Sequence, residues 1–322
     1  VFNVMSQKKI LIIGETIIDY YQFCETIGKS GKEPMLVLSK LNKKILIGGA
    51  ASIAKNINNL NKNVFFLSFL GEKKEYKKEV NNFLKKIKSK FFYKSNSTTI
   101  VKKRYVDKFS NHKVLGVYEM NDKPLDKKNE KKLEDYLKKN LHKYDITMVL
   151  DYGHGFLSKK ICDLISKKTN FLSVNCQINA NNQGLHSINK YNNQDCTLIN
   201  ETELRNELKD KDSDIEKLCS EFSHKSKSKN LIVTFGKRGA LLYQKNSKKI
   251  INVPAFGNKI KDKVGAGDVF LSYFTIFFAC SKNIRLSLYA GSLAAAEAIK
   301  EYGNYLNTNL ETLKQTINYK MK

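Results

Sequence analysis

Short runs of apolar residues recur along the chain, and most of them are followed by a segment with helical spacing. The runs are KILIIG (9–14), NVFFLSFLG (63–71), DITMVLDYG (145–153), NFLSVNC (170–176), DCTLIN (195–200) and LIVTFG (231–236). Continuous apolar strands of this kind are typical of a parallel sheet whose two faces are both covered. Because no break in composition interrupts the alternation, it predicts one doubly wound α/β domain over residues 1–322, with a mostly parallel sheet and helices on both faces.

Several of the intervening segments place their apolar residues at helical spacing. One face of the segment GGAASIAKNINNL carries Ala50, Ile53, Ala54, Ile57 and Leu60. Ser158 precedes the segment KKICDLISKK and is a candidate N-cap. The lysine-rich segments 72–90 and 127–141 also have apolar positions on one side and lysine on the other. We therefore expect helices in all four places.

Two regions interrupt the alternation of strands and helices. Residues 20–47 and 98–119 both have the composition of strands, with no helical segment between them and the neighbouring core elements. Since each is an insertion between elements of the main sheet, we expect the two to pair into a small separate β-sheet.

The chain is strongly basic, with 57 Lys and Arg residues against 31 Asp and Glu residues and a formal net charge of +26. A charge of this size invites a nucleic-acid hypothesis, which predicts tight and steeply salt-dependent binding. The lysines, however, lie on the polar sides of the predicted helices, and no nucleic-acid-binding motif accompanies them. We expect no nucleic-acid partner, although a basic surface would attract anionic substrates such as nucleotides and sugar phosphates.

The cysteines and the apolar stretches both indicate a cytoplasmic protein without a membrane partner. The six cysteines form no C-x-x-C pair, which favours reduced and mostly buried thiols. The apolar run ILIIG near the N-terminus is too short for a signal peptide. The longest apolar stretch, 269–280, is about a dozen residues, whereas a bilayer span needs about 20. It predicts a core helix.

The segment KIKDKVGAGDVF (259–270) carries the strongest chemical signal. Gly265 and Gly267 lack a Cβ, so the main chain can approach a ligand closely just before the apolar helix. The N–H groups of that helix start would favour an anion there. An aspartate on the rim, Asp268, makes sense as a base that takes a proton from a hydroxyl attacking a phosphate. The alternative is that Asp268 is only a helix N-cap.

Three weaker signals lie elsewhere in the chain, each with a purely structural alternative. Gly48-Gly49 opens an amphipathic helix and allows close approach, or it is only a turn. Asn200 and Glu203 could orient waters on Mg²⁺ near a triphosphate, although Asn-x-x-Glu is also the capping-box pattern. Asp19 follows the first strand, where a carboxylate is well placed to accept hydrogen bonds from sugar hydroxyls.

Together and in this order, the motifs resemble those of the ribokinase-like, or PfkB, carbohydrate kinases. Gly48-Gly49 with Asn56 is similar to the N-terminal signature, Asn200-x-x-Glu203 to the Mg²⁺ and phosphate motif, and DKVGAGD (262–268) to the C-terminal signature. The resemblance covers nearly the whole chain. It implies a ribokinase-like α/β fold with a small β-sheet lid, and ATP-dependent phosphoryl transfer to a hydroxyl of a sugar or sugar phosphate.

Within that family, the chain is similar to the D-glycero-D-manno-heptose 7-phosphate kinase domain of ADP-heptose synthases. The residues that carry this likeness are Glu33-Pro34, Thr98-Thr99, Lys102-Lys103-Arg104 and the stretch DYGHG (151–155). The likeness implies a heptose 7-phosphate-like substrate. It also implies a separate nucleotidyltransferase acting on the product, since the sequence contains no such domain.

The resemblance implies roles in phosphoryl transfer for the matching residues. Asp268 would be the catalytic base, and the main-chain N–H groups of Gly265, Ala266 and Gly267 would form the anion hole. Glu203, with Asn200, would hold Mg²⁺ through water. Asp262 would bind a monovalent cation such as K⁺. Residues Thr234, Gly236 and Gly239 would line the ATP site.

On the substrate side, the resemblance implies that Asp19, Gly48, Gly49, Asn56 and Asp151 hold the sugar. Lys102 and Arg104 are candidates for binding a phosphate group of the substrate. The alternative is that they are ordinary charged residues on the surface of the lid. The insertions 20–47 and 98–119 would form the lid over the sugar and join two subunits into a homodimer.

The chain departs from the heptose kinases mainly on the substrate side. Glu15 replaces the usual aspartate, His154 replaces a lysine, and Asn175-Cys176-Gln177 replaces an Asp-Pro-Lys-like stretch. The loop VNCQINANNQG resembles a less characterised branch of these kinases. The reaction class is therefore better defined than the sugar. The rival hypothesis is a non-catalytic regulator that binds a sugar or nucleotide on the same fold.

Overall fold

The computed structural model describes residues 2–178, 182, 186–257, 260–303, 306 and 315. Its main sheet has nine strands in the order β13-β12-β11-β10-β9-β8-β1-β4-β5. The strands are β1 (Ile10–Gly14), β4 (Val64–Gly71), β5 (Lys88–Lys94), β8 (Ile146–Asp151), β9 (Leu172–Cys176), β10 (Cys196–Asn200), β11 (Asn230–Thr234), β12 (Ala240–Gln244) and β13 (Lys249–Val253). Neighbouring strands are parallel from β5 to β11, whereas β12 and β13 are antiparallel. The predicted fold class is confirmed.

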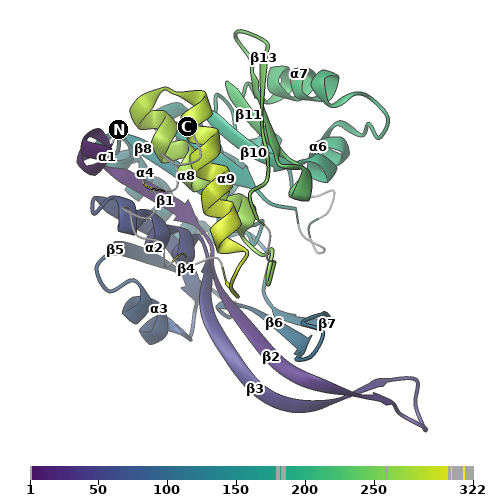
Figure 1. Ribbon diagram of the computed structural model, residues 1–322. Coiled ribbons are helices and arrows are strands. Elements are labelled where there is room, and N and C mark those ends of the chain that lie inside the picture. Colours follow the sequence, from purple (N-terminus) through teal and green to yellow (C-terminus); the bar gives the residue numbers. More distant parts are fainter. Residues whose placement is uncertain are drawn as a thin grey trace.

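Helices flank this sheet. They are α1 (Phe2–Gln7), α2 (Ala50–Leu60), α3 (Lys77–Phe83), α4 (Lys127–Asn140), α5 (Lys159–Lys168), α6 (Glu201–Leu208), α7 (Ile215–Ser226), α8 (Ala266–Ser281) and α9 (Ile284–Ala298). Figure 1 shows α2, α8 and α9 in front of the sheet, and α8 packs against both α9 and α2. The other helices include two packed pairs, α4 with α5 and α6 with α7.

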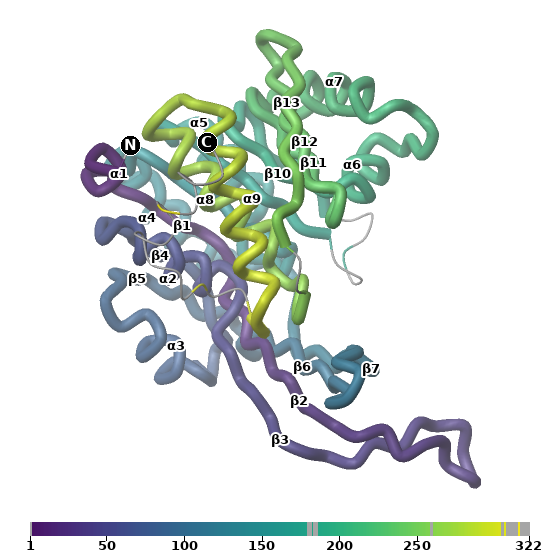
Figure 2. The backbone as a smooth tube through the Cα atoms, in the orientation of Figure 1, coloured from purple at the N-terminus to yellow at the C-terminus, as the bar shows by residue number. Residues whose placement is uncertain are grey.

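The two insertions pair into a second sheet, as predicted. It has four strands in the order β3-β2-β6-β7, formed by β2 (Thr16–Lys29), β3 (Leu36–Gly49), β6 (Ile100–Asp107) and β7 (Lys113–Glu119). Figures 1 and 2 show this sheet extending away from the main body, with β2 and β3 reaching farthest. We call it the lid sheet. Because β2 begins two residues after β1 ends and β3 runs directly into α2, the lid sheet is anchored at the carboxyl edge of the main sheet.

Most helix predictions are confirmed, including α2, α4 and the buried helix α8. Ser158 is the N-cap of α5, and its side chain accepts a hydrogen bond from the N–H of Ile161. The prediction for 72–90 is only partly right, since the helix covers Lys77–Phe83 and Lys88–Lys94 form the edge strand β5. The Phe91 and Phe92 side chains explain the difference, because an edge strand can pack them against the core.

The described helices provide no candidate for a membrane span, since none combines the required length with a sufficiently apolar composition.

Candidate active site

The N-terminus of α8 is built on a left-handed glycine. Gly265 is the N-cap with a φ of 75°, a conformation that residues with a Cβ rarely adopt. The first amides of a helix have no helical carbonyl partner, so those of the Gly265 turn are available to an anion, apart from Ala266, which donates weakly to Lys263 at 3.3 Å. Asp268 lies inside the first turn of α8 rather than at the cap. The N-cap alternative for Asp268 is therefore wrong.

The Asp268 carboxylate is buried and held by two donors from other strand ends. The Tyr152 hydroxyl donates to Oδ2 at 2.9 Å, and the Asn175 amide donates to Oδ1 at 2.6 Å. Burial raises the pKa of Asp268 to about 6, although both hydrogen bonds oppose the rise. A carboxylate with such a pKa can accept a proton near neutral pH. Neither partner was expected from the sequence.

One cleft joins the predicted nucleotide-site residues to this helix start. Thr234, Gly236 and Gly239 line it together with Ala266 and Gly267. The remaining wall contains apolar side chains and two lysines, namely Ala255, Phe256, Ile260, Ile299, Lys237 and Lys263. An apolar cleft that also contains two lysines and the first residues of α8 suits a planar base with a phosphate chain.

Asn200 and Glu203 form a complete capping box at the start of α6. The Asn200 side chain accepts from the N–H of Glu203, and the Glu203 carboxylate accepts from the N–H of Asn200 and of Ile178. Burial raises the pKa of Glu203, and no cationic side chain pairs with it among the described residues. Its charge also raises the pKa of Asp268. Hard oxygen donors whose charge reaches Asp268 fit a hydrated Mg²⁺.

Asp19 lies on β2 of the lid sheet, diagonally across from Gly48 of β3. Its carboxylate pairs with Arg104 at 2.5 Å, and both side chains are buried. A Cβ built on Gly48 would lie 1.9 Å from Asp19 Oδ2, so glycine at 48 is what leaves room for this carboxylate. Gly49, with a φ of 60°, is the N-cap of α2. Asn56 does not lie at the start of α2 with the two glycines. It is about two helical turns along the helix, and its Oδ1 accepts a hydrogen bond from the N–H of Leu306.

Lys102 lies on the same face of the lid sheet as Asp19. The two residues are register partners in β6 and β2, so their side chains point to the same side of the lid sheet. Burial lowers the pKa of Lys102, and no described residue forms an ion pair with its ammonium group. Arg104, by contrast, is engaged with Asp19.

His154 follows β8 and is fully buried at 0% exposure. Its Nδ1 hydrogen-bonds the Asp122 carboxylate at 2.7 Å, and its Nε2 has no partner among the described residues. Burial and the nearby charge of Lys102 lower the pKa of His154 to about 4. At neutral pH the ring is therefore uncharged, with Nε2 as an acceptor. Glu15, whose pKa burial raises to about 7, accepts the main-chain N–H groups of Tyr152 and His154 and positions this loop.

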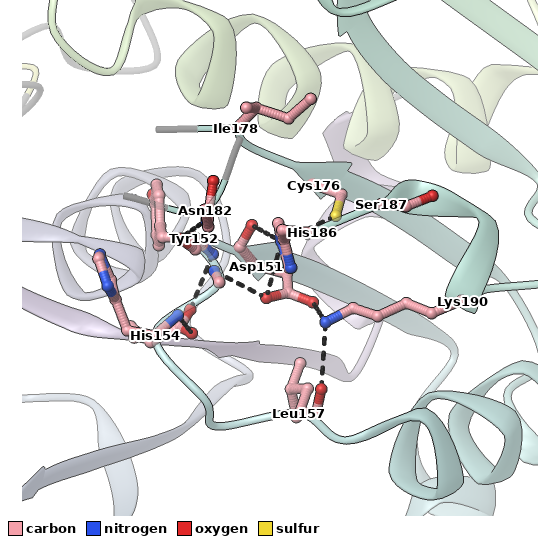
Figure 3. Close-up of polar contacts among 12 residues, drawn as sticks. Asp151, Tyr152, His154, Leu157, Cys176, Ile178, Asn182, His186, Ser187 and Lys190 are labelled. Carbon is pink, nitrogen blue, oxygen red and sulfur yellow. Dashed lines mark hydrogen bonds and ion pairs between the residues drawn. The ribbon is translucent and has the colours of Figure 1, made fainter. Parts of the chain in front are cut away.

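Asp151 is at the centre of a separate buried network (Figure 3). Its carboxylate receives Lys190 at 2.6 Å, the Tyr191 hydroxyl at 2.6 Å and the N–H of Gly153 at 3.1 Å. Among the described residues, Asp151, Cys176 and His186 place ligand-type atoms within 4.8 Å of one another. The Lys190 ammonium already balances the Asp151 charge, and burial raises the pKa of Cys176 far above its ordinary value. The network therefore supports the strand ends rather than a metal ion.

Figure 3 also shows the His154 ring pointing away from the Asp151 network. The sequence placed Asp151 and Asp19 in one substrate site. In the structure, the Asp151 carboxylate instead accepts hydrogen bonds from residues of its own buried network. The loop that follows Cys176 includes residues 179–181 and 183–185, which lie outside the described residues.

Asp262, the predicted ligand of a monovalent cation, is almost fully buried and already has three donors. Lys113 from β7 donates to Oδ1 and the Tyr21 hydroxyl from β2 donates to Oδ2, both at 2.5 Å. The N–H of Val264 also reaches Oδ1, at 3.1 Å. Because the Lys113 ammonium and the Tyr21 hydroxyl occupy the two oxygens, the carboxylate does not fit an alkali cation.

Comparison with protein families finds one match that covers most of the chain. The family model of the pfkB family carbohydrate kinases matches residues 7–311. Among curated proteins, the bifunctional protein HldE of Helicobacter acinonychis is 26% identical over 320 residues, and that of Campylobacter jejuni (strain RM1221) is 25% identical over 310 residues. These alignments cover 97% and 94% of this chain but only 66% and 63% of the two relatives.

Solved structures share the fold. Phosphofructokinase-2 of Escherichia coli, crystallised in complex with potassium, is 16% identical, with a TM-score of 0.77 and coverage of 98% of this chain and 100% of that one. Ribokinase of Thermotoga maritima is 20% identical, with a TM-score of 0.70 and coverage of 97% and 99%.

Proposed function

Because this chain belongs to the pfkB family of carbohydrate kinases, we propose that it transfers the terminal phosphoryl group of ATP to a hydroxyl of a sugar or sugar phosphate. The observation that carries the proposal is Asp268, buried at the start of α8 beside the cleft that contains Gly267. The base takes the hydroxyl proton, the oxygen bonds to the terminal phosphorus, and the bond to ADP breaks. The amides of the Gly265 turn stabilise the negative charge of the transferred group.

ATP would lie in the cleft lined by Thr234, Gly236 and Gly239, with its phosphates toward Ala266 and Gly267. Mg²⁺ would be held through water by Glu203 and Asn200, and when bound it neutralises charge on the phosphates. The side chains of this protein would position the two substrates and stabilise the charge that develops on the phosphoryl group. Positioning and charge stabilisation account for most of the catalysis of phosphoryl transfer.

The acceptor that we propose is a phosphorylated sugar of the heptose 7-phosphate type. Asp19 would accept hydrogen bonds from sugar hydroxyls. Lys102, half-buried and without an ion-pair partner among the described residues, would bind the phosphate of the acceptor. The likeness to HldE proteins supports this choice of acceptor at low identity.

The direct test is ATP consumption with a panel of sugars and sugar phosphates, including heptose 7-phosphate. We expect ADP and a doubly phosphorylated sugar from at least one phosphorylated acceptor. If ATP and the panel bind but no phosphoryl group moves to any acceptor, the non-catalytic regulator replaces the kinase.

The pH dependence of turnover should report the Asp268 carboxylate. Since the base works ionised and its pKa is about 6, kcat/KM should rise with pH through about 6 and level off above it. Tyr152→Phe removes a hydrogen bond that lowers this pKa, so the limb should move upward by about one unit, the scale of one hydrogen bond. A pH–rate profile of both proteins measures the shift. If the rise of the profile occurs at the same pH in both proteins, a group other than Asp268 is responsible for it.

Lys102→Met should selectively weaken the use of phosphorylated sugars as acceptors. Loss of a charged hydrogen bond should lower kcat/KM for a sugar phosphate by about 10- to 100-fold and barely affect an unphosphorylated sugar. Lys103→Met is the matched control, because Lys103 lies on the opposite face of β6, over the Tyr20 and Tyr105 rings. Equal losses for both classes of sugar would exclude Lys102 as the phosphate ligand.

We also propose a homodimer formed through the lid sheet. Large apolar side chains are exposed along it, namely Ile27, Met35, Leu36, Ile45, Leu115 and Val117. An exposed apolar surface of this extent is typical of a protein–protein contact. A partner nucleotidyltransferase acting on the product remains part of the proposal, as does the absence of nucleic-acid partners.

A further inference from the structure

The Asp262 carboxylate connects the lid sheet to the segment before the Gly265 turn. Asp262 is 3% exposed and precedes Gly265 by three residues. Two of its three donors, Lys113 and Tyr21, come from the lid sheet, and the third is the main-chain N–H of Val264. The contact therefore joins two strands of the lid sheet to the segment that leads directly into the Gly265 turn.

The charges at this contact balance without any added ion. The Lys113 ammonium carries one positive charge against the single negative charge of Asp262, and it lies 2.5 Å from Oδ1. Burial and the nearby carboxylates raise the pKa of Tyr21, so the phenol stays protonated and remains a donor. No other acidic side chain forms an ion pair with Lys113 among the described residues.

The same oxygen that binds Lys113 also fixes the main chain of the turn. Oδ1 accepts both the ammonium and the N–H of Val264, which is the residue before Gly265. Additional lid contacts support Tyr21, whose ring packs 4.9 Å from that of Tyr302. Tyr302 in turn donates to Asn111 at 2.9 Å. A cation at Oδ1 thus orders the entry to the turn.

We propose that the Lys113 ammonium is a built-in replacement for a monovalent cation at Asp262, so that catalysis needs no added K⁺. An ammonium group supplies the same unit charge and three donors, and it is tethered to the lid sheet. Lys113 is a positioning residue, since it acts on the anion-binding turn through Asp262. The inference rests on the proposed kinase function for its activity readout only.

The test compares wild type with Lys113→Met in K⁺, Na⁺ and a bulky organic cation at equal ionic strength. Wild-type turnover should vary less than about twofold among the salts. Lys113→Met should lose about tenfold in Na⁺ or the organic cation, the scale of one charge-assisted hydrogen bond, and should regain most of it in K⁺. Lys108→Met, at an exposed position on the turn between β6 and β7, is the matched control and should behave like wild type.

A second readout does not depend on turnover. K⁺ added to Lys113→Met should raise the midpoint of thermal unfolding relative to Na⁺, whereas the wild-type midpoint should not distinguish the two salts. Lys113→Arg, which keeps the charge, separates loss of the cation from general damage to the lid. Wild type that is activated or stabilised by K⁺ over Na⁺ overturns the proposal, as does a Lys113→Met protein that responds to neither. Absence of any kinase activity would refute the proposed function and leave the unfolding comparison to decide the role of Lys113.

Discussion

Replacing Asp268 with asparagine is expected to lower kcat by about 10² or more, while ATP binding stays close to that of wild type. This is the scale of losing a general base. The amide has nearly the same shape as the carboxylate, so the hydroxyl of Tyr152 and the amide of Asn175 keep a partner. An amide cannot take the proton of the attacking hydroxyl. Steady-state kinetics with a responsive acceptor, and calorimetry for ATP, measure the two effects separately.

Asp212→Asn is a suitable control, because Asp212 is an exposed carboxylate outside the site. It should leave both measurements unchanged. Near-normal turnover in Asp268→Asn would remove Asp268 from its role. A parallel loss of ATP binding would point to a structural fault instead.

Replacing Gly48 with alanine is expected to lower kcat/KM for the acceptor by about 10² and to leave the KM for ATP unchanged. The added Cβ would lie 1.9 Å from Asp19 Oδ2, so the carboxylate must move away. Asp19 is also the buried partner of Arg104, so its displacement disturbs the face of the lid sheet that we propose holds the sugar. A displacement of about 1 Å near reacting groups can cost about 10²-fold in rate.

Gly31→Ala makes a matched control for Gly48→Ala. Gly31 is also in the β2–β3 insertion, but a Cβ there would meet nothing within 4 Å. It should have wild-type kinetics. If Gly48→Ala binds and turns over its acceptor normally, Asp19 is not a sugar ligand.

Several features of this protein could be predicted from local sequence. The apolar runs of the central strands define a sheet because residues buried on both faces leave few polar positions. The start of α8 could be recognised from Gly265, because the left-handed backbone at this position favours glycine. The capping box of α6 could be recognised from Asn200 and Glu203, which are only three residues apart. Each of these signals depends on residues close together in the chain.

The partners of the key side chains could not be predicted in that way. Asp268 receives its hydrogen bonds from Tyr152 and Asn175, which are 116 and 93 residues away in the sequence. Tyr152 directly follows β8, and Asn175 is near the end of β9. The contact between Lys113 and Asp262 spans 149 residues. A lysine in a lysine-rich lid has no local mark that separates it from its exposed neighbours.

By itself, the sequence determined the alternation of strands and helices, the lid insertions and the glycine turn before α8, because spacing and backbone restrictions act over a few residues. The tertiary structure alone decided which donors surround Asp268, that Asp151 and Arg104 are committed to internal ion pairs, and that a lid lysine reaches Asp262. Those outcomes depend on strand order and register, which bring the ends of distant strands to one edge of the sheet, where burial then sets the charge and pKa of each group.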